Sequence, residues 1–266
     1  MNLISPAPNR HERLINNQLG LVIGQARFPR LPRFAENGYT LPFEDAMRER
    51  FPKASRAPTI NVIIKDNEVK TETGDLALRF TDLEDRYTVV LTADFIALEC
   101  RVYDSFENFN SHFMIIVGLA GKLFDVKHRL RLGLRYINEL RWSKATTYVQ
   151  WQSFLNQEYM GWNPVEKLGG TMLHTIAEFA AKREDGVFRL RRGFLQGSTI
   201  PQLETKRKTD PTEFYLIDLD YSDESPVPLM ADLPQRLQRY HDFIEDIFFE
   251  MTGNSELQAY LRGANA

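Results

Sequence analysis

Residues 128–140 read HRLRLGLRYINEL, a run in which basic and hydrophobic side chains alternate. The odd-numbered positions carry Arg129, Arg131, Gly133 and Arg135. The even-numbered positions carry leucine at 130, 132 and 134 and tyrosine at 136. Alternation with a period of two is typical of a β-strand, because successive side chains point to opposite faces of a sheet. The stretch therefore predicts a strand with one hydrophobic face and one strongly basic face.

The same Arg-x-Arg-x-Gly motif recurs at residues 189–193, within the strand-like run GVFRLRRGFLQG (186–197). If the two strands are neighbours, five arginines share one surface of the sheet: Arg129, Arg131, Arg135, Arg189 and Arg191. Like charges that lie directly opposite each other destabilise a sheet. Such a surface therefore needs either carboxylates from the same chain or a bound anion.

Asp218 and Asp220 are the candidate carboxylates, because they alternate along a third strand-like run, EFYLIDLDY (213–221). One interpretation is a structural Arg–Asp network across the sheet. The other leaves part of the arginine surface available for phosphates, which a planar guanidinium binds through two parallel hydrogen bonds. Gly133 and Gly193 would allow a backbone or a ligand to approach closely, although glycine in a strand equally marks a bulge.

The flanking sequence extends this pattern into a mixed fold. Before the quoted stretch we predict strands at 19–29, 59–65, 75–81 and 87–103, with a break near 93–96, and helices at 43–51 and from about 105 to 124. After it we predict a helical stretch at 147–162, the strands at 186–197 and 213–221, and a helix from about 232 to 252. Hydrophobic residues recur at steps of three and four in both long helices.

Both halves of the chain repeat one order of elements: strand, helix, several strands, then a long amphipathic helix. We therefore predict an α+β fold of two tandem units, each an antiparallel sheet covered by a long C-terminal helix. The boundary falls near Lys127, so that the units are residues 1–127 and 128–266, and internal duplication is the simplest explanation.

The bulk composition bounds the class of protein. The chain has 266 residues, of which 43% are hydrophobic and 26% charged, and this is typical of a globular protein. A single cysteine, Cys100, excludes an internal disulfide and a cysteine-based zinc cluster, and its apolar strand indicates an inert core residue. No segment resembles a signal peptide or a membrane span, so we predict a cytoplasmic protein.

Charge is unevenly distributed, although the net charge is only −3. Residues 128–208 contain 14 Lys or Arg against 7 Asp or Glu, whereas residues 209–266 contain 3 against 12. A basic block followed by an acidic block usually indicates that the two pair within the fold. The alternative is a basic surface that is available for a polyanion.

No motif indicates a particular reaction. The sequence lacks a phosphate-binding glycine loop, a nucleophile elbow and a dinucleotide-binding fingerprint, so we predict no cofactor. His112 and His241 occupy similar positions on the two long helices, which favours structural histidines where a helix meets a sheet. Asp218, Asp220 and His241 together remain the candidate metal or acid–base site.

Several motifs resemble those of a sporadically distributed, uncharacterised family of bacterial proteins of about this length. They are RLGLRYIN (131–138), RFP (27–29), LECRVY (98–103), LIDLD (216–220) and a histidine-centred C-terminal helix that ends FFEMT (248–252). The resemblance covers most of the chain and implies a patchy distribution, as for accessory or defence-linked genes. It implies no catalytic residues.

Two functional hypotheses follow from these patterns. The first is a non-enzymatic binding or accessory protein, which recognises nucleic acid, a phosphate ligand or an acidic protein partner through the five arginines. The alternative is a metal- or acid–base-assisted hydrolase of nucleotides or nucleic acid, which uses Asp218, Asp220 and His241. The repeated one-sided arginine pattern favours the first hypothesis.

Overall fold

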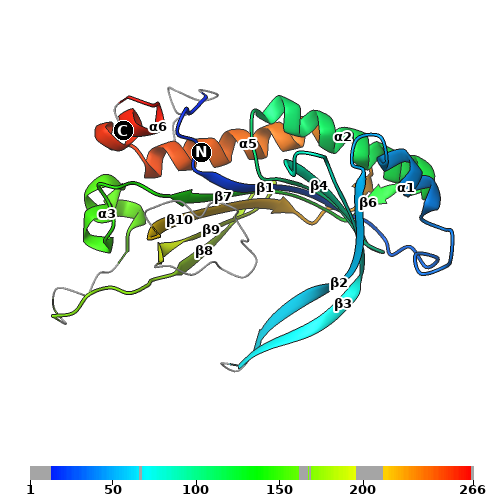
Figure 1. The fold of residues 1–266 in the computed structure, drawn as a ribbon, viewed down its shortest axis with the longest axis horizontal. Coiled ribbons are helices and arrows are strands. Elements are labelled where there is room, and N and C mark those ends of the chain that lie inside the picture. The colour runs from blue at the N-terminus through cyan, green and yellow to red at the C-terminus, as the bar shows by residue number, and fades with distance from the viewer. Residues whose placement is uncertain (1–12, 66–67, 162–166, 168, 196–211, 265–266) are drawn as a thin grey trace. The chain divides into compact units, whose positions relative to one another are not determined.

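The computed structural model describes residues 13–65, 68–161, 167, 169–195 and 212–264. Runs of strands are separated by helices along the chain (Figure 1), and the paired strands are antiparallel, which confirms the predicted α+β class. The chain divides into two compact units, and each consists of several segments. Unit 1 is residues 1–21, 134–222 and 236–266; unit 2 is residues 22–133 and 223–235.

Unit 2 contains a sheet with the strand order β2-β3-β4-β5-β1. The strands are β1 (Leu19–Arg27, which begins in unit 1), β2 (Lys53–Lys65), β3 (Glu68–Thr81), β4 (Tyr87–Leu91) and β5 (Phe95–Cys100). The expected break in the run 87–103 is confirmed, because β4 ends at Leu91 and β5 begins at Phe95. Thr92 stabilises this turn, since its hydroxyl accepts hydrogen bonds from the backbone N–H groups of Asp94 and Phe95.

Helix α2 (Phe106–Leu123) packs on the unit 2 sheet, as its periodicity predicts. Ser105 caps its first turn by accepting a hydrogen bond from the Asn108 N–H at 3.2 Å. The helix buries Phe109 and Phe113, and a methyl group added at Gly24 of β1 would meet both rings at 3.1 Å. The small residue in β1 is therefore what lets the aromatic face of α2 lie close to the sheet.

The hairpin of β2 and β3 is much longer than the strand beside it. Its two strands pair from Lys53 with Thr81 to Lys65 with Glu68, whereas β4 pairs only with residues 78–81 of β3. The distal half of the hairpin therefore extends as a two-stranded arm beyond β4 (Figure 1). Helix α1 (Leu41–Met47) precedes the hairpin and ends earlier than the predicted helix 43–51.

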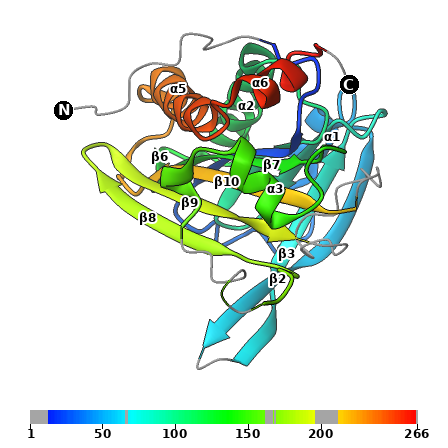
Figure 2. The ribbon, with the colours of Figure 1, turned by 90° about the vertical axis from the view of Figure 1, so that its left-hand side faces the viewer.

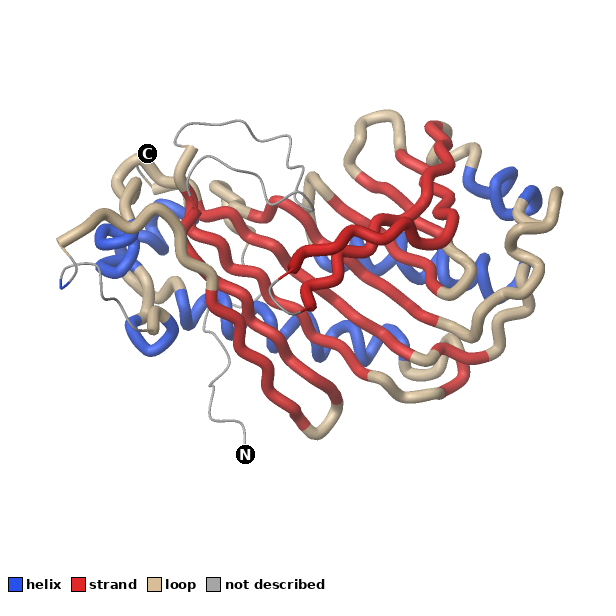
Figure 3. Tube along the Cα trace, turned by 90° about the horizontal axis from the view of Figure 1, so that it is seen from below, coloured by secondary structure: helices blue, strands red, loops and turns tan. Residues whose placement is uncertain are grey.

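Unit 1 contains a sheet with the order β7-β10-β9-β8. The strands are β7 (Arg131–Leu140, which begins in unit 2), β8 (Ala177–Arg183), β9 (Gly186–Leu195) and β10 (Phe214–Asp223, whose last residue belongs to unit 2). Residues 196 and 197 of the predicted strand 186–197 lie outside the described residues. Figure 3 shows these strands in front of helix α5 (Leu233–Met251).

Helix α5 buries the stripe of residues that its periodicity predicts. The buried members are Leu233, Leu237, Tyr240, Ile244, Ile247, Phe248 and Met251. Tyr240 stacks on Tyr221 of β10 with ring centroids 4.4 Å apart, and this contact fixes which face of β10 the helix covers. The odd-numbered residues of β10 near Tyr221 face α5, and Asp218 and Asp220 face the other way.

Three elements of unit 1 differ from expectation. The stretch predicted as one helix at 147–162 forms α3 (Tyr148–Phe154) and a short 3-10 turn (Gln157–Tyr159), because the Asn156 N–H bonds to the Met251 carbonyl instead of continuing the helix. Helix α6 (Ser255–Leu261) follows α5, and strand β8 precedes β9 (Figure 2); neither was predicted. No helix among the described residues is long and apolar enough to cross a membrane.

Candidate binding surface

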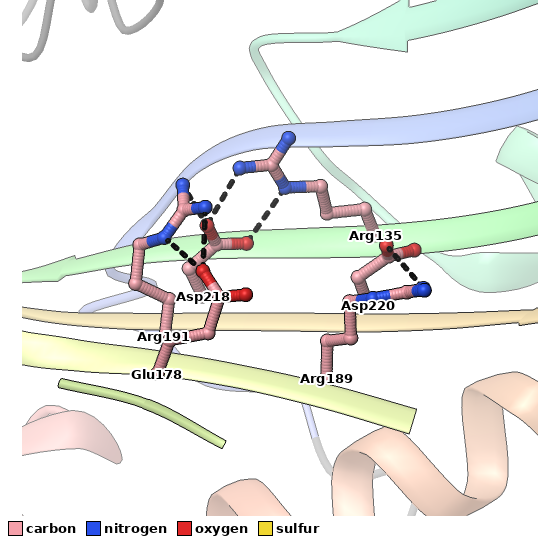
Figure 4. Close-up of a pocket in the computed structure, with 6 residues that line it drawn as sticks. All are labelled: Arg135, Glu178, Arg189, Arg191, Asp218 and Asp220. Atoms are coloured by element: carbon pink, nitrogen blue, oxygen red, sulfur yellow. Dashed lines mark hydrogen bonds and ion pairs between the residues drawn. The ribbon is translucent and has the colours of Figure 1, made fainter. Parts of the chain in front are cut away.

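The face of the unit 1 sheet opposite α5 carries a row of side chains with alternating charge. Asp218 of β10 lies in register with Arg191 of β9, which lies in register with Glu178 of β8. Arg135 of β7 completes the row by binding Asp218 from the other side (Figure 4). The row therefore reads positive, negative, positive, negative across four neighbouring strands, and opposite charges are the favourable cross-strand arrangement.

Arg135 and Asp218 form the firmly held pair. The Nε and Nη2 atoms of Arg135 donate to the two carboxylate oxygens of Asp218 at 2.7 and 2.6 Å. The Asp218 side chain is only 5% exposed. Although burial lowers the pKa of Arg135, the hydrogen bonds and the charge of Asp218 raise that pKa above its ordinary value. This two-point contact is therefore structural, as the Arg–Asp network interpretation expects.

Arg191 and Arg189 are held more loosely. Arg191 is 37% exposed and donates from Nη2 and Nε to a single oxygen of Glu178 at 2.8 and 3.1 Å, while Glu178 is itself 51% exposed. Its second carboxylate contact, to Asp218, is 3.8 Å long. Arg189 is 43% exposed and lies 3.9 Å from Asp220, with a 3.4 Å hydrogen bond to the Ser222 hydroxyl. Exposed ion pairs of this kind contribute about 0–1 kcal/mol each.

These six side chains line a shallow pocket (Figure 4): Arg135, Glu178, Arg189, Arg191, Asp218 and Asp220. Its volume is about 90 Å³. Pockets that enclose a small organic ligand hold about 300–1,000 Å³. The pocket therefore has room for a few water molecules, and it is a shallow depression in an open surface and not a ligand cavity.

Arg129 does not belong to this surface, and the prediction that placed it there is wrong. Its side chain is 0% exposed, and the strand breaks after it: β6 (His128–Arg129) pairs with β11 (Val227–Pro228) in a separate two-stranded ladder. Nη1 donates to the carbonyl oxygens of Pro228, Leu229 and Ala231 at 3.2, 3.0 and 2.7 Å. Nη2 donates to the Asp232 carboxylate at 2.9 Å, so Arg129 is a buried clamp within unit 2.

Arg131 also belongs to unit 2. Its Nη1 donates to the side-chain oxygen of Gln25 on β1 at 2.9 Å. Of the five predicted arginines, the pocket of unit 1 therefore brings together Arg135, Arg189 and Arg191. The shared five-arginine surface is replaced by a smaller cluster of three arginines and three carboxylates.

The structure does not bring Asp218 and Asp220 together with His241. His241 is buried on α5, and its Nδ1 lies 3.0 Å from the Tyr136 hydroxyl. Tyr136 and Arg135 are adjacent on β7 and therefore point to opposite faces of the sheet. The two aspartates lie on the Arg135 face. Among the described residues, no group of three His, Cys, Asp or Glu side chains is placed to hold a metal ion.

The remaining candidate residues have structural environments. His112 is half-buried between α2 and β4, with its ring centroid 4.7 Å from that of Tyr87, as expected for a histidine where a helix meets a sheet. Burial raises the pKa of the Cys100 thiol to about 12, so this thiol is uncharged at neutral pH and is a poor nucleophile. This agrees with its interpretation as an inert core residue.

Glu178 is the member of the cluster that sequence reasoning missed. It lies on β8, whose sequence AEFAAKR is rich in alanine and lacks the β-branched residues that usually mark a strand. A usable signal lies just downstream: Glu184 and Asp185 form a tight turn between Arg183 and Gly186, which are paired. A turn directly before a predicted strand indicates a hairpin partner upstream, and that partner is β8.

We expect Asp218→Asn to lower the free energy of unfolding by about 2 kcal/mol, because it removes the charge that a half-buried guanidinium binds through two hydrogen bonds. Asp220→Asn is the matched control, because it changes the same type of residue two positions away, where the ion-pair contact is 3.9 Å long. We expect less than about 0.5 kcal/mol there. Urea denaturation of both variants measures the difference, and equal losses would contradict the assignment of Asp218 as the anchor.

The chain matches no protein-family model and no curated protein sequence.

Proposed function

We propose that this protein is a non-enzymatic binding or accessory protein that docks an acidic protein surface on the open face of the unit 1 sheet. The observation that carries the proposal is the contrast within the cluster. Arg135 is committed to Asp218, whereas Arg189 and Arg191 present exposed guanidinium groups with long or exposed carboxylate contacts. A carboxylate of the partner can replace Glu178 beside Arg191 at a small cost in free energy, because an exposed ion pair contributes only about 0–1 kcal/mol.

The charge balance of the cluster favours a protein over a polyanion. Three carboxylates lie among the three arginines, so the local charges cancel. Nucleic-acid affinity depends on the number of phosphates that a protein neutralises, and interspersed carboxylates oppose it. Protein interfaces are enriched in arginine and tolerate mixed charge. Nucleic acid and phosphate ligands are therefore the alternative, and the experiment must distinguish them from a protein partner.

The hydrolase alternative loses its geometric basis, because its two aspartates and its histidine lie on opposite faces of the sheet. The proposal therefore assigns no catalytic residue. In this proposal Arg189 and Arg191 contact the partner. Arg135 and Asp218 have a structural role, because their ion pair holds the row of charged side chains in place.

The decisive experiment is retention of cellular proteins on the immobilised full-length chain. We expect Arg189→Gln/Arg191→Gln to reduce retention of a specific partner at least tenfold. Arg33→Gln is the control, because Arg33 is an exposed arginine of unit 2. Nuclease treatment and a heparin column test whether the ligand is a polyanion instead. Loss of retention after nuclease treatment, or elution of the wild type from heparin only at high salt, would show that the ligand is nucleic acid and not a protein.

A partner that binds the double variant as well as the wild type would contradict the proposal altogether. Denaturation of the double variant must accompany the assay, because the two arginines lie on one strand. We expect its stability to change by less than about 1 kcal/mol, because glutamine removes two exposed ion pairs without placing a new negative charge opposite Asp218, Asp220 or Glu178.

Two finer points belong to the same proposal. We propose that the two units arose by duplication, which the combination of an antiparallel sheet and a long helix in each supports. We also propose a cytoplasmic location for the protein and an accessory or defence-linked role. A single buried cysteine is consistent with a reducing compartment.

A further inference from the structure

Strand β8 forms the end of the unit 1 sheet. Among the described strands it pairs with β9 alone. Three consecutive residues of β8, Glu178, Phe179 and Ala180, are exposed, and Phe179 is 57% exposed. Since consecutive residues of a strand point to opposite faces, both faces of this edge are open to solvent. An exposed edge strand is a template for pairing with another strand.

The residues of β8 are self-complementary about Ala180. When two copies pair antiparallel around a two-fold axis perpendicular to the sheet, each residue lies opposite one equally far on the other side of the centre. Centring the pair on Ala180 sets Glu178 opposite Lys182 of the second copy, and the symmetry repeats this contact. On the other face, Phe179 then lies against Ala181, a small residue that leaves room for the ring.

The neighbouring symmetric registers lack this match. Centring the pair on Phe179 sets Glu178 opposite Ala180. Centring it on Ala181 sets Glu178 opposite Glu184 of the second copy, which is a repulsive pair. Only the register about Ala180 places opposite charges directly across the strands of β8.

We propose that the protein forms a symmetric homodimer through antiparallel pairing of β8 with β8 of a second copy. The charged row of the sheet supports this partner. It ends at Glu178, a carboxylate, and Lys182 of the second copy continues the alternation of sign across the dimer axis. The dimer places the exposed Arg189 and Arg191 of both copies on one continued sheet face. It does not depend on the binding function proposed above.

Sedimentation of the full-length protein tests the dimer. We expect a species of twice the 30.9 kDa chain mass. Lys182→Glu sets two like charges against each other at both contacts, and we expect it to weaken dimerisation at least tenfold. The exchange Glu178→Lys/Lys182→Glu restores opposite charges at both contacts across the axis, but its new lysine lies opposite Arg191 in the same chain, so we expect it to regain at least threefold of the lost affinity. Lys122→Glu, an exposed charge reversal on α2, is the control.

A crosslink fixes the register independently. Residues paired across antiparallel strands have Cα atoms about 4.5–5.5 Å apart, which is within reach of a disulfide. Ala180→Cys should therefore give a disulfide-linked dimer under mild oxidation, and the native Cys100 is buried and does not interfere. Glu184→Cys, about 27 Å from its symmetry mate in this register, should not crosslink. The proposal would be overturned by a wild-type protein that is monomeric, or by a dimer whose affinity Lys182→Glu does not change. Crosslinking through a cysteine at position 184 but not at 180 would also overturn it.

Discussion

Arg129→Met is expected to lower the free energy of unfolding by about 4 kcal/mol, the largest single effect predicted for this chain. The guanidinium is fully buried and donates to three backbone carbonyls and to the Asp232 carboxylate. Methionine fills a similar volume but donates no hydrogen bond, so the carbonyls lose their partner without gaining water. The segment that leads into α5 would lose its attachment to β6.

Equilibrium urea denaturation measures this effect, with Arg131→Met as the matched control two residues along the chain. Arg131 is half-buried and makes a hydrogen bond to the neutral Gln25 side chain, so we expect a loss of about 1 kcal/mol. Equal losses at the two positions would show that burial of Arg129 contributes nothing beyond an ordinary surface contact.

Gly193→Ala is expected to lower the free energy of unfolding by about 3 kcal/mol, at the upper end of the usual cost of overpacking. A Cβ at this position would lie 1.8 Å from the Thr175 carbonyl oxygen, which is part of the backbone and cannot rotate away. Thr175 is fixed there because its N–H donates to the Phe194 carbonyl at 2.8 Å. The segment before β8 must therefore move for alanine to fit.

Gly133→Ala is the control for this prediction, since it changes the glycine of the other Arg-x-Arg-x-Gly motif. There the nearest atom to an added Cβ is the end of the flexible Arg131 side chain, at 2.9 Å. We expect a change within about 0.5 kcal/mol, because the lower conformational freedom of alanine in the unfolded chain offsets the small displacement of Arg131. Thermal unfolding of the two variants compares them, and similar melting temperatures would refute the close-approach explanation of Gly193.

Much of the fold follows from local sequence patterns, because the relevant interactions repeat with the period of the element. The stripe from Leu233 to Met251 predicts α5, and hydrophobic residues at steps of three and four predict α2. The change of hydrophobic face near Ala93 predicts the break between β4 and β5. An Arg–Asp network is one of the two interpretations of the alternating strands, and the pair that Arg135 forms with Asp218 fits it.

The remaining features depend on partners that are distant in the chain. Period-two alternation continues through Leu130, but its N–H donates to the Arg27 carbonyl, and the strand is interrupted there. The carbonyls that surround Arg129 lie about a hundred residues away, so no local pattern reveals that this arginine is buried. The sequence did not predict Glu178 as a member of the cluster, because β8 is a strand through its pairing with β9 and not through the β-propensity of its own residues.

The central claim is that Arg189 and Arg191 form a docking surface while Arg135 and Asp218 support it. The most direct measurement is the amount of partner protein that immobilised Arg189→Gln/Arg191→Gln retains, relative to wild type of equal folded content and after nuclease treatment. The account predicts a loss of at least tenfold with the free energy of unfolding preserved to within about 1 kcal/mol. Full retention by the folded double variant would contradict it.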